Sequence, residues 1–140
     1  MLSLFLFGPV SASELVNRLN PTFSRINTTQ GLSQSTVNVI FQDSTGIIWV
    51  GTIEGLNSYD GEKFEQFFSS SAANSLSNDY VSAIIEDADG VLWIGTDNGL
   101  NAFDGVRSIF SQVDLDESES GFAADHSSIR SLFIDTQSRL

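Results

Sequence analysis

The residues that come closest to a metal-binding pattern are Asp87, Asp89 and Gly90. Alternating carboxylates ahead of a glycine resemble the start of a calcium-binding loop, where they converge on one hard cation. However, the matching turn forty-four residues earlier reads DSTG, without the second carboxylate, and the twelfth loop position holds Asn98 instead of Glu. We therefore interpret residues 87–90 as a hairpin turn, and predict neither a metal site nor a cofactor.

The other side chains capable of catalysis stand outside any recognisable motif. His126, the only histidine, lies in the loop-like segment AADHSS, and no serine has the glycines of a nucleophile elbow around it. The carboxylates could supply a glycosidase-type pair, but most of them fall at predicted turns. Cysteine is absent, which excludes disulfides, thiolate ligands and a cysteine nucleophile. We predict no catalytic residue in this segment.

Two tryptophans could form a stacking surface for a sugar, because aromatic faces suit the apolar face of a pyranose ring. Trp49 and Trp93 each lie, however, in a run of consecutive apolar residues that recurs once per repeat, and this favours a packing role. Tyr59 and Phe103 receive the same interpretation. We predict that all four belong to the core.

These aromatic residues stand in a repeat with a period of forty-four residues. Shifting residues 32–61 by that distance aligns them with residues 76–105 and gives fourteen identities in thirty positions. A period of this length, without long helical segments, is typical of a four-stranded propeller blade. The residues of the first copy that recur unchanged are Leu32, Ser33, Val37, Ile40, Asp43, Gly46, Trp49, Gly51, Thr52, Gly55, Leu56, Asn57, Asp60 and Gly61.

Turn signals divide the first copy into four segments of strand length, residues 37–43, 46–52, 55–60 and 63–69. The second segment is apolar at consecutive positions, as expected when both faces of a sheet are covered. The Asp of each Asp-x-x-Gly turn can accept backbone N–H bonds, and its Gly suits a positive φ. We predict an all-β fold of four-stranded antiparallel propeller blades.

Incomplete copies flank the two complete ones. Residues 127–140 place Ile129 and Asp135 where Val81 and Asp87 stand, now at an offset of forty-eight. Residues 22–27 (TFSRIN) match a fourth strand without the first three, as if they closed a blade from the other terminus. Two blades cannot close a ring, so we expect the isolated chain to be marginally stable or prone to aggregation.

The amino terminus has the order of a signal peptide. Residues 2–10 (LSLFLFGPV) are apolar and are followed by the small residues SAS, so cleavage after Ala12 or Ser13 would fit. The alternative is an apolar segment that packs on the domain. Nine residues are too few to span a bilayer, which takes about 20 in a helix. A basic residue before the run is missing, since the first one is Arg18, which suggests a misplaced or truncated start.

The net charge restricts the partners that the chain can bind. Eighteen acidic residues against six basic ones give a formal charge of −12. Such a balance disfavours any partner that is bound through its phosphates. We therefore predict no nucleic-acid binding and, after signal cleavage, no membrane insertion by this segment.

The repeated segments resemble the two-component regulator propeller repeat, which joins a Val-x-x-Ile strand, an Asp-x-x-Gly turn, a Trp-[Ile/Val]-Gly-Thr strand and a Gly-Leu turn. Residues 31–64 and 75–105 carry this pattern in register. The resemblance implies a seven-bladed periplasmic propeller, usually followed by a further β-domain, a transmembrane helix and a histidine kinase or diguanylate cyclase. It also implies sensing of a saccharide or another small polar ligand. About two and a half of the seven blades would lie in this chain.

We divide the chain accordingly into a signal peptide remnant (1–13), an N-terminal segment with the closing outer strand (14–30), blade 1 (31–69), blade 2 (70–112) and an acidic loop with the start of blade 3 (113–140). Function in repeat scaffolds usually lies where the copies differ. These places are residues 53–54 against 97–98, residues 69–79, and the insertion 114–125, which holds five carboxylates and is otherwise a solvated acidic loop.

The function predicted from these features is a non-catalytic, ligand-sensing region of a periplasmic receptor. Its predicted partners are a saccharide or other small polar ligand, the remaining blades of the propeller and, in the full-length receptor, a second copy in a homodimer. The protein as a whole would be anchored in the inner membrane. An exported propeller enzyme acting on polysaccharide and a protein-interaction scaffold are the alternatives.

Overall fold

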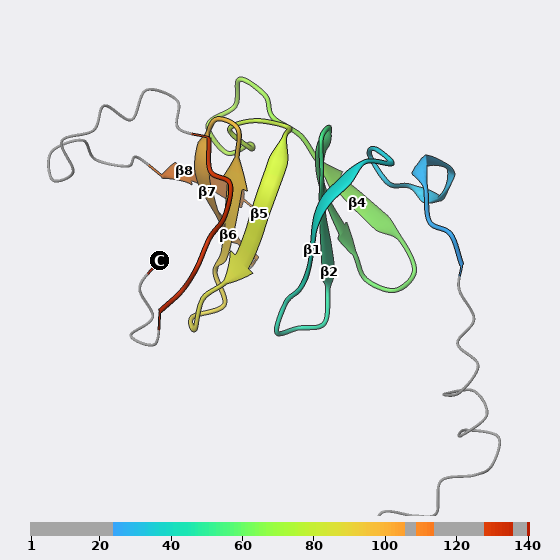
Figure 1. The fold of residues 1–140 in the computed structure, drawn as a ribbon, viewed down its shortest axis with the longest axis horizontal. Helices are drawn as coiled ribbons and strands as arrows, with labels where there is room; N and C mark the ends of the chain where they lie inside the picture. The colour runs from blue at the N-terminus through green and yellow to red at the C-terminus, as the bar shows by residue number, and fades with distance from the viewer. Residues whose placement is uncertain (1–23, 106–108, 114–127, 136–139) are drawn as a thin grey trace, which may run out of the picture.

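The computed structural model describes residues 24–105, 109–113, 128–135 and 140, which form two four-stranded antiparallel sheets. Figure 1 shows the sheets side by side, each built from strands that are consecutive in the chain. A 3-10 helix, η1 (Thr28–Gln30), precedes the first sheet. The first sheet comprises β1 (Val37–Gln42), β2 (Ile48–Thr52), β3 (Gly55–Tyr59) and β4 (Phe64–Phe67). The second comprises β5 (Val81–Glu86), β6 (Leu92–Thr96), β7 (Gly99–Asp104) and β8 (Ile109–Val113).

The two sheets repeat one another in register as well as in strand order. Val50 pairs with Asn57 across β2 and β3, and Ile94 pairs with Asn101 across β6 and β7. Both first strands also shift register at the same place, between Val37 and Val39 and between residues 81 and 83. The prediction of an all-β fold of four-stranded antiparallel blades is therefore confirmed, and we name the sheets blade 1 (β1–β4) and blade 2 (β5–β8).

The turn chemistry explains why strands form at these residues. Gly46 and Gly90 close the first turn of each blade with φ of 95° and 81°, a backbone region that residues with a Cβ rarely adopt. Each amide of these glycines donates to the carbonyl of the aspartate that opens the turn, Asp43 or Asp87. The aspartate–glycine turn predicted between the first and second strands is confirmed in both blades.

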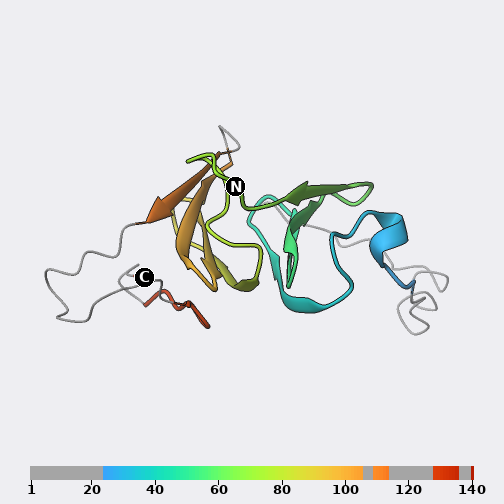
Figure 2. The ribbon, with the colours of Figure 1, turned by 90° about the horizontal axis from the view of Figure 1, so that it is seen from above.

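The blades pack face to face, with β5 lying against β1 and β2 (Figures 1 and 2). Trp49 of blade 1 meets Phe103 of blade 2 edge to face, with ring centroids 5.1 Å apart. Gly51 leaves the space that Val81 fills, because a Cβ at Gly51 would lie 2.6 Å from Val81 Cγ1. The absence of a side chain at one residue of β2 therefore determines how closely the next blade approaches.

The far side of blade 1 lacks such a neighbour among the described residues. Ile40 and Ile84 hold the same place in their blades, yet Ile40 is 66% exposed and Ile84 is 8% exposed. The difference arises because blade 1 covers Ile84, whereas no described segment covers Ile40. The exposed side of blade 1 has the residues of a blade interface.

The start of the third copy docks on blade 2 at the predicted residue. Ile129 donates its amide to the Thr96 carbonyl at 2.9 Å, and its carbonyl accepts from Ser82 Oγ. A Cβ at Gly95 would lie 2.6 Å from Ile129 Cγ2, just as one at Gly51 would meet Val81. Residues 128–135 form no strand in the described structure, but Ile129 occupies toward blade 2 the place that Val81 occupies toward blade 1.

Several other predictions concern residues that are not described. The leader (1–13), the insertion (114–125) and His126 lie outside the described residues, as do residues 22 and 23 of the predicted closing strand. Residues 24–27 form no strand. The partner strands of that predicted strand belong to another blade, so it stays a prediction. No helix in the described ranges is long and apolar enough to cross a membrane.

Candidate functional site

An aspartate and a tryptophan form the same hydrogen bond in both blades. The indole Nε1 of Trp49 donates to Asp43 Oδ2 at 2.8 Å, and that of Trp93 donates to Asp87 Oδ2 at 2.8 Å. The second carboxylate oxygen accepts two backbone amides of the turn, those of Thr45 and Ile47 at 2.9 Å in blade 1. Burial favours the neutral acid, yet these hydrogen bonds outweigh it and lower the pKa of Asp43.

The same balance of burial against hydrogen bonds lowers the pKa of Asp87. Each of these carboxylates is therefore an ionised turn acceptor that fixes a tryptophan. Asp87 lies in the hairpin turn that we predicted at residues 87–90. Within the described residues, no three acidic or histidine side chains are grouped so that they could hold a metal ion.

A second polar cluster lies at the opposite end of each blade. Asn57 and Thr52 are fully buried, and Asn57 bonds to Ser33 through both groups of its amide: Oδ1 accepts the Ser33 amide at 2.8 Å and Nδ2 donates to Ser33 Oγ at 2.8 Å. Thr52 Oγ1 donates to the Gly55 carbonyl at 2.9 Å. Ser77, Thr96 and Asn101 repeat this arrangement in blade 2.

This serine–threonine–asparagine cluster was not singled out from the sequence. The signal was present, because all three residues recur unchanged in the second copy. Each hydroxyl and amide of the cluster makes a structural hydrogen bond. Among the described residues, no buried side-chain nitrogen or oxygen is without a partner.

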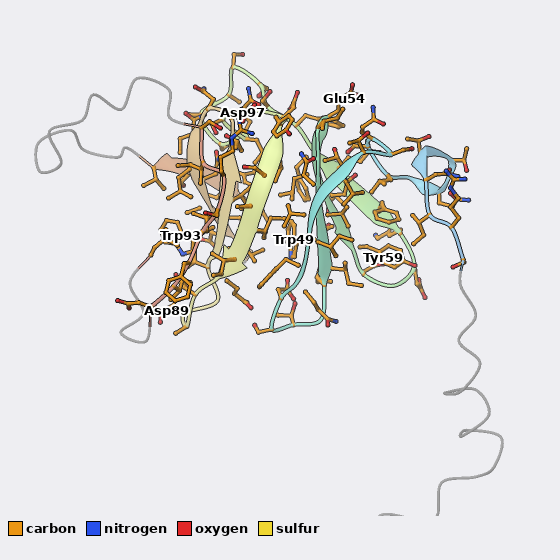
Figure 3. All side chains as sticks on the ribbon, in the orientation of Figure 1. Trp49, Glu54, Tyr59, Asp89, Trp93 and Asp97 are labelled. Atoms are coloured by element: carbon orange, nitrogen blue, oxygen red, sulfur yellow. The ribbon has the colours of Figure 1, made fainter. Side chains whose placement is uncertain are left out.

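The variable turns lie together at the end of the blades that carries this cluster. Figure 3 places Glu54 and Asp97 at the same end, away from Asp89. Glu54 is exposed, whereas Asp97 accepts from Ser128 Oγ at 2.8 Å and lies 3.7 Å from the Arg130 guanidinium. The loop between β4 and β5 lies at the same end as the two turns (Figure 1). We name these two turns and this loop the loop end.

Of the four aromatic residues predicted to belong to the core, two are buried in it and two are half-buried. Trp49 and Phe103 are each 5% exposed and belong to the cluster between the blades. Trp93 is half-buried. It holds in blade 2 the place of Trp49, which packs on the next blade, but no further blade lies against Trp93 among the described residues. Tyr59 is half-buried as well, stacked on Phe64 at 4.6 Å with its hydroxyl donating to the Gly61 carbonyl.

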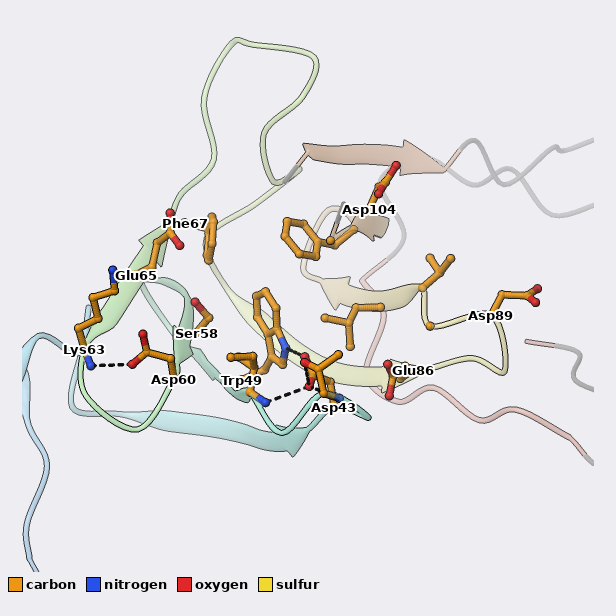
Figure 4. A pocket seen from close by; sticks show the side chains of 17 residues that line it. Asp43, Trp49, Ser58, Asp60, Lys63, Glu65, Phe67, Glu86, Asp89 and Asp104 are labelled. Atoms are coloured by element: carbon orange, nitrogen blue, oxygen red, sulfur yellow. Dashed lines mark hydrogen bonds between the residues drawn. The ribbon is translucent and has the colours of Figure 1, made fainter. Parts of the chain in front are cut away.

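A cavity of about 680 Å³ opens between the blades at the end opposite the loop end. Its inner wall includes the aliphatic side chains of Ile47, Val91 and Leu92 and three aromatic rings that contact one another, those of Trp49, Phe67 and Phe103. Turns and strand ends of both blades form its rim, as the close-up in Figure 4 shows. The rim carries one ammonium group, Lys63, and the carboxylates of Asp43, Asp60, Glu65, Glu86, Asp89 and Asp104.

Glu86 joins the blades at this rim. Its two carboxylate oxygens accept the amide and the hydroxyl of Ser44, both at 2.7 Å. Asp60 has its pKa lowered by the backbone amides of Lys63 and Glu62, which donate to it. The rim is therefore anionic at neutral pH. The sequence did not indicate this cavity, because its wall and rim come from turns that are far apart in the chain.

Comparison with known proteins identifies the repeat. The family model described as Two component regulator propeller matches residues 31–54 and 75–98. Over 63 residues, the chain is 41% identical to histidine kinase P4 of Formosa agariphila. The matched region makes up 45% of this chain and 5% of that protein. The chain therefore spans a small fraction of this relative.

Two similar solved structures are described as extracellular domains. One is that of BT3049 of B. thetaiotaomicron, described as a hybrid two component system, with a TM-score of 0.64, 30% identity, and coverage of 74% of this chain and 15% of that chain. Another is that of BT4673 of the same organism, described as a one component system, with a TM-score of 0.52, 24% identity, and coverage of 64% and 14%. The second likeness concerns the fold alone.

Proposed function

Because residues 31–54 and 75–98 are two-component regulator propeller repeats, we propose that the chain is a non-catalytic, ligand-sensing part of a periplasmic receptor. The receptor would pass the signal to a histidine kinase or a diguanylate cyclase across the inner membrane. The observation that carries this proposal is the pair of in-register repeats, together with a relative described as a histidine kinase. The BT3049 structure, described as the extracellular domain of a hybrid system, supports export.

The hydrogen bonding supports a role without catalysis. Among the described residues, the buried polar side chains are the repeated threonines and asparagines. Together with the half-buried serines and aspartates of the repeat, they are held by partners in the same blade. A catalytic group must exchange protons or form bonds with a substrate, whereas these groups hold strands and turns in place. Residues that recur once per blade serve the scaffold.

The loop end is the place where we locate recognition of the sensed ligand. The two copies agree in their strands and in the aspartate–glycine turn, but at the β2–β3 and β6–β7 turns they carry Ile53-Glu54 and Asp97-Asn98. Variable loops on a constant frame are the usual location of binding residues. A saccharide or another small polar ligand would bind there and shift a conformational or dimeric equilibrium.

The remaining blades of the propeller are part of the proposal. Ile40 and Val37 are 66% and 40% exposed, while Ile84 and Val81, their counterparts in blade 2, are 8% and 0% exposed under blade 1. A preceding blade of the same repeat type would cover Ile40 in the way that blade 1 covers Ile84. A ring of seven such blades would have no exposed blade face.

The proposal is tested first by the coding sequence that follows codon 140. A membrane-spanning stretch followed by kinase or cyclase motifs is expected. A stop codon soon after ring closure would overturn the receptor and favour a secreted propeller.

The loop end is tested by a matched pair of exposed glutamates at opposite ends of blade 1, Glu54 and Glu62. In the full receptor, Glu54→Ala should shift the saccharide concentration that half-activates output, whereas Glu62→Ala should leave it unchanged. Both variants should keep the thermal midpoint of the parent, because both side chains are exposed. Equal responses of the two variants would refute recognition at this turn.

A further inference from the structure

We propose that the cavity between blades 1 and 2 is a second binding site, which takes a small organic cation such as a quaternary ammonium or alkylammonium group. It lies at the end opposite the loop end and does not depend on the ligand proposed for that end. Three properties carry the inference: the volume of the cavity, its aromatic wall and the sign of its charge.

The volume is that of a ligand site. At about 680 Å³ the cavity lies within the roughly 300–1,000 Å³ that small-molecule pockets occupy. It is formed at a junction between two packed units, where such pockets are common. Both sides of the junction are held in place, since Glu86 of blade 2 bonds to Ser44 of blade 1.

The inner wall presents fixed aromatic surfaces. Trp49 cannot turn freely, because its Nε1 is bonded to Asp43 at 2.8 Å and its ring packs on Phe67 and Phe103 at centroid distances of 5.9 Å and 5.1 Å. Phe67 is only half-buried, so part of its ring faces the cavity. Such rings attract a cation within about 6 Å of their centroids through their quadrupole.

The rim has the charge that a cation requires. Six carboxylates and one ammonium group line the cavity. Hydrogen bonds keep Asp43 and Asp60 ionised, because they lower the pKa of both carboxyls. Glu65 extends from β4 beside Phe67 (Figure 4) and is exposed at the mouth of the cavity. An anion such as a phosphate or a sugar acid would be repelled here.

A bare metal ion fits this site less well than an organic cation. Hard cations need several oxygens that converge at about 2.0–2.6 Å. The rim carboxylates do not converge: Glu86 is turned to Ser44, Asp43 to Trp49, and Asp89 points away from the aromatic wall (Figure 4). A group with apolar substituents around a positive charge matches an aromatic wall under an anionic rim.

The test compares choline with 3,3-dimethylbutan-1-ol, which has the same shape without the charge. The chain, or the longer polypeptide that carries it if the chain alone is marginal, is labelled with 5-fluorotryptophan, so that Trp49 at the wall and Trp93, which does not line the cavity, give separate ¹⁹F signals. Choline should shift the Trp49 signal in a saturable way, and the neutral alcohol should bind at least about tenfold more weakly. The Trp93 signal should not move.

Two variants of equal charge change make the test specific. Glu65→Gln removes a rim carboxylate, whereas Glu54→Gln removes an exposed carboxylate at the loop end. Glu65→Gln should weaken choline binding about threefold or more, while Glu54→Gln should leave it within error, because the distant charge is screened beyond roughly 10 Å. Equal binding of choline and the alcohol, equal effects of the two variants, or a shift confined to Trp93 would each overturn the site.

Discussion

Replacing Gly51 with alanine should loosen the contact between the two blades without altering any polar group. Gly51 lies within β2 in extended backbone, so the effect of a methyl group there is steric. The new Cβ would lie 2.6 Å from Val39 Cγ1 in its own blade and 2.6 Å from Val81 Cγ1 in the next. Carbon atoms in contact prefer about 3.5–4.0 Å, so each neighbour must retreat by about 1 Å.

The cost of this retreat can be estimated from the surroundings. Overpacking a filled core costs about 1–3 kcal/mol. Val81 is fully buried, and the half-buried Val39 is packed against the core cluster, so the new methyl group meets a packed neighbour on each side. We expect Gly51→Ala to lower the free energy of unfolding by about 2–3 kcal/mol, in the upper part of that range because both sides are blocked.

The assay is urea unfolding followed by tryptophan fluorescence, with Gly105→Ala as the matched control. A Cβ at Gly105 would meet only Phe103 Cε1, at 3.9 Å, so this variant should differ from the parent by less than about 0.5 kcal/mol. The measurement uses the chain, or the longer polypeptide that carries it if the chain alone is marginal. Equal stabilities of the Gly51 and Gly105 variants would refute the steric argument.

A double-mutant cycle separates the contact between blades from the contact within blade 1. Val81→Ala alone should destabilise by leaving a cavity, but it also removes the Cγ1 atom that the new methyl group strikes. The combined variant should therefore lose less stability than the sum of the two single changes. Strict additivity would mean that Val39 alone causes the effect.

Three further predictions follow from the repeated hydrogen bonds and from the exposed side of blade 1. Asp43→Asn should destabilise by about 1–3 kcal/mol at neutral pH and flatten acid unfolding. Because the pKa of Asp43 is lowered in the folded state, its carboxylate stabilises the fold at pH values above the ordinary pKa of 3.8. This stabilisation is lost as the pH falls through the folded-state pKa. An acid transition that Asp43→Asn leaves unchanged would argue against this role. Asn57→Ala should cost about 1–3 kcal/mol in thermal or urea unfolding, because the buried Val50 carbonyl loses the Asn57 donor; a change below about 0.5 kcal/mol would contradict this. In the isolated chain, Ile84→Ser should lower the stability strongly, whereas Ile40→Ser should hardly change it. In the longer protein, both variants should lower the stability. If Ile40→Ser is neutral there, this would speak against a preceding blade.

The proposed sensor and the proposed cation site assign different tasks to the two ends of the blades. The loop end carries the residues that differ between the copies, while the opposite end carries the aspartate turns and the cavity. A ligand that binds between blades would stabilise their packed arrangement by mass action. The choline titration reports on the cavity, and the receptor assay with the Glu54 and Glu62 variants reports on the loop end.

Local patterns in the sequence are sufficient to predict the strands, their turns and the repeat. Period-two and consecutive apolar patterns, aspartate–glycine turns and glycine positions are local signals, so the predicted strands at 37–43 and 46–52 agree with β1 and β2 within two residues. The role of Trp49 in packing could also be predicted, because a residue needed in every blade recurs in every copy. The same argument was less accurate for Trp93, whose burial depends on a neighbour beyond blade 2.

The contacts between residues of different blades depend on how the blades pack. The Ser44–Glu86 bond and the cavity wall of Trp49, Phe67 and Phe103 join segments that no local pattern relates. Ile40 and Ile84 hold the same position in the repeat, but they differ in exposure because only Ile84 is covered by a neighbouring blade. Burial and electrostatic surroundings are properties of the packed blades, whereas the sequence of one repeat specifies only the blade.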